Sequence, residues 1–249
     1  MFYGIPEEKK QDFNKAVKII LDIYPNVYAG DMLFCMWRNL AFRNDEPFME
    51  SYRACVTNKQ EESLLWRLHV LGWAAKNALN VEGVFIECGV FKGFCSAVLC
   101  KYLEFNNLNR NFYLYDTFSG LPEETSTKEE RKDWDYSDYD TDELFKNVVE
   151  VFSEYNNVEV IKGIVPDVLE QSPLDKVAFL HIDMNSEKAE ILALEYLFDR
   201  VVPGGIIVLD DFGWSCNRNQ TVAELAFMNA RQHYILELPT GQGVILKHG

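Results

Sequence analysis

The sequence predicts an α/β fold: a seven-stranded, mostly parallel sheet with its last strand antiparallel, preceded by an N-terminal helical extension. Two observations predict this fold. From position 84 onward, short apolar runs alternate with longer segments of helical spacing, which is the pattern of buried parallel strands joined by helices on both faces of a sheet. Near the C-terminus, only residues 239–243 separate two strand-like runs, and so short a connection forms an antiparallel hairpin.

The individual elements follow from the spacing of apolar residues. Lys9 to Tyr24 has apolar residues at helical intervals and ends at Pro25, and Gln60 to Leu79 has the same periodicity. Residues 1–80 are interpreted as the extension and residues 81–249 as the main domain, while residues 31–57 show no clear pattern. Strands are expected at 84–88, 112–115, 158–161, 177–182, 205–209, 234–238 and 244–247, and further helices at 93–105, 142–155, 187–200 and 220–231.

Composition excludes several classes of partner. The formal net charge of -15 argues against a nucleic acid and against an anionic membrane surface, because both are bound through basic faces. The six cysteines contain no Cys-x-x-Cys pair, so they indicate reduced thiols rather than a zinc site. Signal-peptide features and apolar runs of membrane-spanning length are missing from the sequence. We therefore expect a cytoplasmic protein.

An acidic insertion, residues 121–145, follows the second predicted strand. Between Glu123 and Glu143 it has ten acidic and three basic residues, a composition typical of a mobile, solvated loop. Its aromatic residues Trp134, Tyr136 and Tyr139 are unusual in a linker and favour a lid over the substrate. The sequence leaves both interpretations open.

The first predicted strand leads into a candidate cofactor loop, because ligands of open α/β sheets bind beyond the carboxyl ends of the strands. Gly89 permits a tight turn, and Gly93 opens a helix whose free N–H groups attract a carboxylate. Glu87 can meet an ammonium group, directly or through water. Together these residues fit the amino-acid moiety of S-adenosylmethionine (SAM). The Gly-x-x-x-Gly spacing differs from the Gly-x-Gly-x-x-Gly loop that binds a pyrophosphate.

The second strand ends at Asp116, where an acid typically binds the ribose hydroxyls of a nucleoside. Phe118 and Ser119 follow it and are expected to line the adenosine pocket. Gly163, at the end of the third strand, completes the predicted cofactor site. The alternative is that Asp116 only caps a turn.

The fourth and fifth strands end in acids, Asp183 and the pair Asp210 and Asp211. Because these strands are neighbours, the three carboxylates converge at one sheet edge and require a cation or hydrogen-bond donors nearby. We expect them to bind Mg²⁺, which would acidify a substrate hydroxyl. The alternatives are a metal-free cap made by the pair, or Asp183 as a general base. His181, which alternates with Asp183, joins Asp183 and Asp210 as a candidate catalytic residue, unless it is a core histidine.

Taken in order, these motifs resemble the macrocin O-methyltransferase family of class I SAM-dependent methyltransferases, which methylate sugar hydroxyls of natural products with the help of a metal. The resemblance implies a Rossmann-like class I sheet, in which Glu87, Gly89 and Asp116 bind SAM and the three aspartates bind magnesium beside the acceptor. The family pattern Asp-x-Asp-x-Tyr is replaced here by Asp183-Met184-Asn185-Ser186-Glu187, which puts the identity of the acceptor in question. The matching stretches are 85–93, 113–122, 179–183 and 203–213.

The predicted function is therefore O-methylation of a small-molecule acceptor, a sugar or nucleotide sugar. The sequence leaves open whether the protein forms a homodimer through its helical extension. Two alternatives are a metal-independent methyltransferase acting on another small molecule and a catalytically silent SAM-binding partner protein. The acidic pair argues against the silent protein. The glycine spacing and the terminal hairpin argue against a nicotinamide oxidoreductase.

Overall fold

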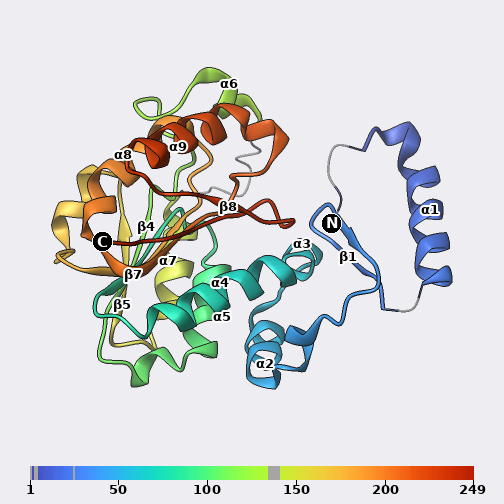
Figure 1. Cartoon of the computed structure of the whole chain (residues 1–249), viewed down its shortest axis with the longest axis horizontal. Helices are drawn as coiled ribbons and strands as arrows, with labels where there is room; N and C mark the ends of the chain where they lie inside the picture. The colour runs from blue at the N-terminus through green and yellow to red at the C-terminus, as the bar shows by residue number, and fades with distance from the viewer. Residues whose placement is uncertain (1, 3–4, 25, 134–140) are drawn as a thin grey trace.

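The computed structural model describes residues 2, 5–24, 26–133 and 141–249, and it contains the predicted sheet (Figure 1). The strand order is β5-β4-β3-β6-β7-β9-β8. Neighbouring strands from β5 to β7 are parallel, and β9 is antiparallel to both β7 and β8, so the C-terminal hairpin is confirmed. The strands are β3 (Val84–Cys88), β4 (Phe112–Asp116), β5 (Val158–Lys162), β6 (Val177–Ile182), β7 (Val201–Leu209), β8 (Leu236–Glu237) and β9 (Gly243–Leu246).

The helices largely occupy the predicted ranges. The segment expected as one helix from Gln60 to Leu79 is instead two helices, because the backbone departs from helical geometry at Leu64. The unassigned region 31–57 contains part of a short hairpin and a helix. The helices and the hairpin strands are α1 (Lys10–Ile23), β1 (Tyr28–Gly30), β2 (Leu33–Cys35), α2 (Glu46–Cys55), α3 (Lys59–Ser63), α4 (Leu65–Ala78), α5 (Phe94–Tyr102), α6 (Lys128–Asp133), α7 (Thr141–Phe152), α8 (Glu187–Leu197) and α9 (Arg218–Ala230).

Each face of the sheet has its own hydrophobic core, because side chains alternate along every strand. On one face, Phe85 and Val208 pack with apolar residues of α4, α5 and α7. On the other face, Ile86 and Ile207 pack with α8 and α9. Figure 1 shows these helix layers on opposite sides of the sheet. Glu87 and Asp210 lie two positions beyond Phe85 and Val208. The same alternation therefore points their side chains toward α5 and α4.

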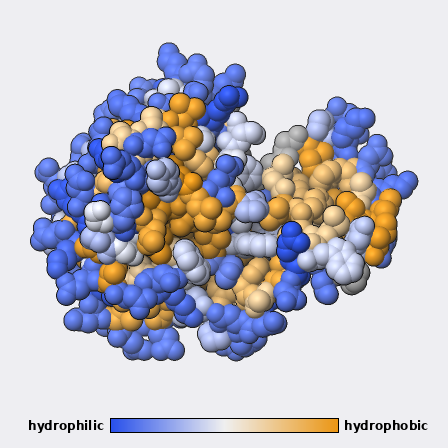
Figure 2. Space-filling model, viewed as in Figure 1, coloured by the Kyte–Doolittle hydropathy of each residue, from blue (hydrophilic) through white to orange (hydrophobic). Residues whose placement is uncertain are grey.

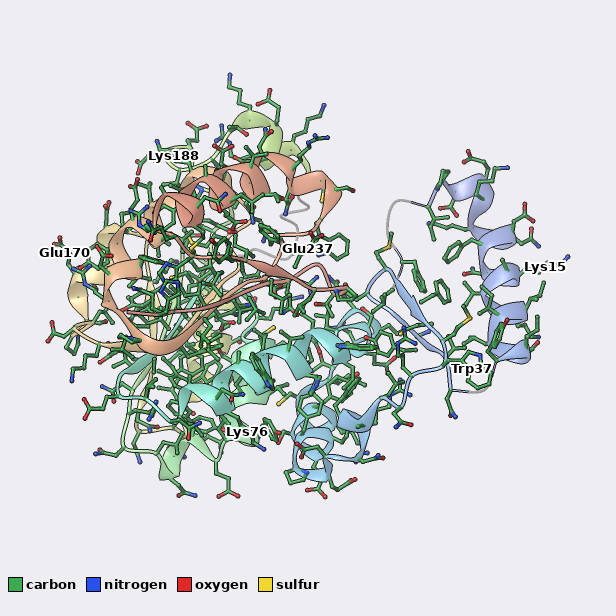
Figure 3. All side chains as sticks on the ribbon, viewed as in Figure 1. Lys15, Trp37, Lys76, Glu170, Lys188 and Glu237 are labelled. Atoms are coloured by element: carbon green, nitrogen blue, oxygen red, sulfur yellow. The ribbon has the colours of Figure 1, made fainter. Side chains whose placement is uncertain are left out.

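The N-terminal extension lies beside the sheet (Figure 1). None of the residues of α1 is buried, and Figure 2 shows a hydrophobic patch on this part of the surface. Phe2 packs against Phe13 and Phe34, which joins α1 to the β1–β2 hairpin. Trp37 is exposed on the extension, away from the sheet (Figure 3). Across the described residues, no helix combines the length and apolarity that crossing a bilayer requires.

Candidate active site

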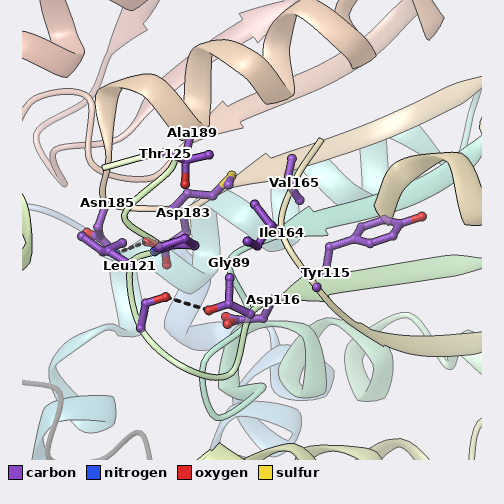
Figure 4. A pocket seen from close by; sticks show the side chains of 15 residues that line it. Gly89, Tyr115, Asp116, Leu121, Thr125, Ile164, Val165, Asp183, Asn185 and Ala189 are labelled. Carbon is purple, nitrogen blue, oxygen red and sulfur yellow. Dashed lines mark hydrogen bonds between the residues drawn. The ribbon is translucent and has the colours of Figure 1, made fainter. Parts of the chain in front are cut away.

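A cleft opens at the carboxyl ends of β3, β4, β5 and β6 (Figure 4), at the sheet edge where ligand binding was expected. The empty space between its lining residues is about 500 Å³, a volume that includes open solvent. Four predicted site residues line it: Gly89, Asp116, Gly163 and Asp183. The other lining residues are Tyr115, Thr117, Gly120, Leu121, Pro122, Thr125, Ile164, Val165, Met184, Asn185 and Ala189.

The turn after β3 packs directly against the end of β6. Gly89 has φ +91°, and a Cβ atom there would lie 1.8 Å from the carbonyl oxygen of Asp183. Gly93 has φ +78°, and its Cβ would lie 2.8 Å from the ring of Phe152 in α7. The glycine at 89 is therefore required by the neighbouring backbone, and the one at 93 faces α7 rather than the cleft.

Asp116 holds the turns around the cleft in place. Its Oδ2 accepts hydrogen bonds from the N–H groups of Val90 and Phe91 at 2.7 and 2.8 Å. Its Oδ1 accepts one from the N–H of Phe118 at 2.6 Å. Phe118 is buried and Ser119 is exposed, so the cleft wall after β4 is made by their neighbours.

A buried polar row crosses the sheet next to the cleft, on the face covered by α4 and α5. Oε2 of Glu87 accepts a hydrogen bond from the hydroxyl of Ser96 in α5, and Oε1 lies 2.8 Å from Nδ1 of His181. The Nε2 atom of His181 lies 3.3 Å from Oδ1 of Asp210. That oxygen also accepts a hydrogen bond from the side-chain amide of Gln242 at 2.8 Å. The structure thus brings Glu87, His181 and Asp210 together, beside the cleft rather than in its wall.

Arg67 of α4 is the cation that the acidic edge requires. Its Nη1 donates to the carboxylate of Asp210, to the carbonyl oxygen of the same residue at 3.1 Å and to Oδ1 of Asp211 at 3.2 Å. Its Nε donates to Oδ2 of Asp31 at 3.0 Å. Asp31 follows β1 at the tip of the hairpin, and both side chains are 6% exposed. Arg67 therefore connects the β1–β2 hairpin of the N-terminal extension to the acidic edge.

Burial and crowding shift the pKa values of these groups in different directions. Burial opposes charging of His181, but hydrogen bonding to Asp210 and Glu87 and their charges raise its pKa to about 10. Burial also disfavours ionised Asp210, yet Arg67 and His181 hold its pKa below the usual range. Burial and nearby carboxylates raise the pKa of Asp183, and burial raises that of Asp211 to about 6 despite Arg67. The two cations thus mainly compensate Asp210.

Three ligand atoms at this edge are close enough to share a metal ion. One atom each from His181, Asp183 and Asp210 lies within 4.8 Å of the other two. The Nε2 atom of His181 is buried and makes no hydrogen bond within the described part of the chain. Asp211, the third predicted ligand, lies against Arg67. The group of possible ligands thus contains His181 in the place expected for Asp211.

A second acidic cluster supports the cleft from the α8–α9 side. Oε1 of Glu190 accepts hydrogen bonds from the N–H groups of Met184 and Asn185 at 3.0 and 3.1 Å. Its Oε2 accepts one from the side-chain amide of Gln220 at 2.9 Å. Burial raises the pKa of the adjacent Glu224 to about 7, and burial together with the charge of Glu224 raises that of Glu190. This cluster fixes the loop that follows β6.

The described part of the acidic insertion is fixed to the start of α8. The carbonyl oxygen of Thr125 accepts a hydrogen bond from the hydroxyl of Ser186 at 2.6 Å. The carboxylate of Glu130 accepts one from the N–H of Glu187 at 2.9 Å. Because residues 121, 122 and 125 also line the cleft, these contacts favour the lid interpretation. The aromatic residues on which that interpretation was based, Trp134, Tyr136 and Tyr139, lie outside the described residues.

Three residues that contact Asp210 or Arg67 at the acidic edge are not predicted from the sequence: Arg67 itself, Asp31 and Gln242. Arg67 is the one with a signal, since it is a single charge in the apolar run from Leu64 to Ala75, and a charged residue in a buried segment needs buried partners. Those partners are 36, 143 and 144 positions away. Local patterns therefore indicate that partners exist but do not identify them.

Comparisons with known proteins agree with this architecture. The family model described as Macrocin-O-methyltransferase (TylF) matches residues 67–234. Mycinamicin III 3''-O-methyltransferase from Micromonospora griseorubida is 27% identical over 161 residues, which are 59% of this chain and 62% of that protein. The 8-demethyl-8-(2,3-dimethoxy-alpha-L-rhamnosyl)-tetracenomycin-C 4'-O-methyltransferase from Streptomyces olivaceus is 25% identical over 199 residues, 74% of each chain. The match thus spans about three fifths of the Micromonospora relative.

Solved structures show the same fold. The O-methyltransferase NovP has a TM-score of 0.64 at 19% identity, covering 74% of this chain and 81% of its own. The calicheamicin methyltransferase CalS11 has a TM-score of 0.62 at 15% identity, covering 97% of this chain and 93% of its own. The family model covers well over half of the chain, and the strand order ends in the antiparallel hairpin. The chain therefore belongs to the macrocin O-methyltransferase (TylF) family and has the class I methyltransferase fold.

Proposed function

We propose that this protein transfers the methyl group of SAM to a hydroxyl oxygen of a sugar or glycan-related small molecule. The observation that carries the proposal is the position of Asp183, which belongs both to the cleft wall and to the acidic edge. A cofactor in the cleft and an acceptor at the edge would meet at this residue. Family membership supports the reaction, and the rhamnosyl group in the name of the Streptomyces relative supports a sugar acceptor.

The cleft supports a cofactor-binding role for Gly89, Asp116 and Gly163, which all line it. Backbone N–H groups orient both oxygens of Asp116, and Oδ1, which accepts one of these bonds, has a lone pair left for a ribose hydroxyl. Both oxygens of Glu87 are engaged, by Ser96 and by the buried imidazole. We therefore assign to Glu87 the orientation of that imidazole in preference to direct contact with an ammonium group.

A divalent cation is part of this proposal because the donor set fits one. Carboxylate oxygens are the ligands that Mg²⁺ prefers, and atoms of Asp183 and Asp210 belong to the group within 4.8 Å. The buried Nε2 of His181 belongs to the same group and lies 3.3 Å from Oδ1 of Asp210. Asp183, Asp210 and, where Arg67 releases it, Asp211 would hold the ion, which when bound lowers the pKa of an acceptor hydroxyl.

The residues of the chain must then position the acceptor and take up its proton. During transfer, the bond from the methyl carbon to the sulfonium sulfur breaks as the bond to the acceptor oxygen forms, and the hydroxyl proton moves to a base. Asn185 is at the position of the family's second acid, and an amide does not accept a proton at neutral pH. We assign the role of proton acceptor to Asp183, the carboxylate that lines the cleft.

A second candidate is methyl transfer without a metal, which the buried cations favour. Arg67 and His181 already face the carboxylates of Asp210 and Asp211. These cations compensate part of the charge for which a metal is otherwise needed. In this form, Asp183 acts as the base and activity does not depend on a divalent ion.

Two experiments test these proposals. Calorimetry with S-adenosylhomocysteine and, separately, with NAD tests the cofactor, and we expect only the former to bind; binding of NAD alone would refute the assignment. A methyl-transfer screen against nucleotide sugars, with Mg²⁺ or with excess chelator, tests the acceptor and the metal. Transfer that requires Mg²⁺ supports the first candidate, and equal transfer in chelator supports the second. Methylation of other small molecules but of no sugar would overturn the sugar acceptor.

A further inference from the structure

Arg67 occupies the space between the two adjacent aspartates to which a divalent cation is expected to bind. Its Nη1 contacts the carboxylate of Asp210 and lies 3.2 Å from Oδ1 of Asp211. The guanidinium is permanently charged in proteins, so it cannot vacate this position by losing a proton. It must move or remain beside any ion that binds there.

The oxygens of Asp210 are already engaged. Its Oδ2 accepts from Arg67, and its Oδ1 accepts from Gln242 at 2.8 Å and lies 3.3 Å from the imidazole of His181. An ion that takes Oδ2 of Asp210 or Oδ1 of Asp211 replaces a contact of Arg67, and an ion on the other oxygens of this pair lies next to the guanidinium. If the guanidinium stayed, two like charges would lie within a few ångströms of each other in a buried site, which strongly opposes binding.

Arg67 has a third carboxylate partner that such an ion would not touch. Its Nε donates to Asp31 at 3.0 Å, through a different nitrogen from the one that contacts the aspartate pair. Asp31 is buried and belongs to the hairpin of the N-terminal extension. Arg67 can thus give up Asp210 and Asp211 and still keep a buried, hydrogen-bonded counter-charge, so that no buried charge is left unpaired.

We propose that Arg67 is a positioning residue that competes with a divalent cation for Asp210 and Asp211, and that Asp31 retains Arg67 when the cation binds. This inference rests on the metal-assisted form of the proposed function. Its consequence is that the hairpin of the extension sets the metal affinity of the acidic edge without contributing a ligand.

Direct binding of Mn²⁺ to the full chain tests the proposal without any methyl transfer. Titrations followed by the electron paramagnetic resonance signal of free Mn²⁺ give the affinity. Arg67→Met should tighten binding by at least about tenfold, because it removes a positive charge next to the ion. Asp31→Asn should weaken binding by about threefold or more in the wild-type background, but by less than about twofold in the Arg67→Met background, because its effect passes through Arg67. Arg53→Met, which breaks an exposed ion pair with Glu46 in α2, is the control and should leave the affinity unchanged.

Each other outcome overturns a stated part of the proposal. If Arg67→Met binds Mn²⁺ no tighter than wild type, competition is refuted. An equal effect of Asp31→Asn in both backgrounds refutes retention. If circular dichroism shows that Arg67→Met does not fold, Arg67→Lys replaces it. A lysine lacks the guanidinium fork that reaches several carboxylates at once, so Mn²⁺ binding should again be tighter than in wild type. Unchanged or weaker binding of Mn²⁺ by Arg67→Lys overturns competition. Failure of every variant to bind Mn²⁺ refutes this inference, whereas methyl transfer in chelator would show that the proposed methyltransferase function stands without it.

Discussion

Replacing Glu224 by Gln should change the pH dependence of stability. Glu190 and Glu224 are fully buried, and burial raises the pKa of Glu224 from 4.5 to about 7. A pKa that is higher in the folded state contributes stability below the unfolded value, and this contribution is lost as the pH rises through the folded value. The shift corresponds to about 3 kcal/mol of unfolding free energy, lost between roughly pH 4.5 and 7.5. A glutamine carries no charge, so the variant should not show this loss.

The measurement is urea unfolding of both proteins at pH 5, 6, 7 and 8. We expect nearly equal stabilities at pH 5 and a variant that is more stable by about 2–3 kcal/mol at pH 8. The matched control is Glu195→Gln, which removes a carboxylate from an exposed position of α8; a gain at pH 8 as large as that of Glu224→Gln would show that burial is not its cause. A Glu224→Gln variant whose difference from wild type stays constant from pH 5 to 8 would show that folding does not raise the pKa of Glu224.

Three further predictions concern the cleft. Gly89→Ala should lower the unfolding free energy by about 2–5 kcal/mol in urea unfolding, because its Cβ would overlap the carbonyl oxygen of Asp183 at a positive φ; wild-type stability would contradict the close packing. Asp183→Ala should reduce the methyl-transfer rate by about 100-fold or more while calorimetry still detects S-adenosylhomocysteine, and a fully active variant in excess chelator would contradict both roles of this residue. Asp116→Asn should weaken S-adenosylhomocysteine binding about tenfold, because an amide NH₂ would face a backbone N–H; unchanged affinity would remove Asp116 from the cofactor site.

The sheet was predictable because its information is local. Buried parallel strands are continuous apolar runs, and the predicted ranges of β3 and β6 agree with the structure residue for residue. The same locality makes the strand ends predictable: the sequence places Gly89, Asp116, Gly163 and Asp183 at one edge of the sheet, and all four line the cleft. Short apolar runs and the residues that follow them are therefore sufficient to predict the part of the site that lines the cleft.

The rest of the site depends on contacts that local patterns do not encode. Three carboxylates at one edge predicted a compensating cation, but the sequence did not show that Arg67 of α4 supplies it. Glu87 was expected to meet an ammonium group, yet the pleat of β3 turns it toward Ser96 and the buried imidazole. Residues 31–57 show no clear pattern because a three-residue strand such as β2 is too short for a periodic pattern.

The two halves of the site are therefore built in different ways, and this difference bears on specificity. The half proposed to bind the cofactor consists of strand ends whose geometry the sheet fixes, whereas the acidic edge is tied through Arg67 to Asp31 in the β1–β2 hairpin. A change in the hairpin can alter the charge and the access of the acidic edge while the turn at Gly89 and its contact with β6 stay unchanged. Asn185, the departure from the family pattern, also lies in the cleft wall next to that edge. Selection for a new acceptor would therefore act on the extension and on the loop after β6, leaving the cofactor loop unchanged.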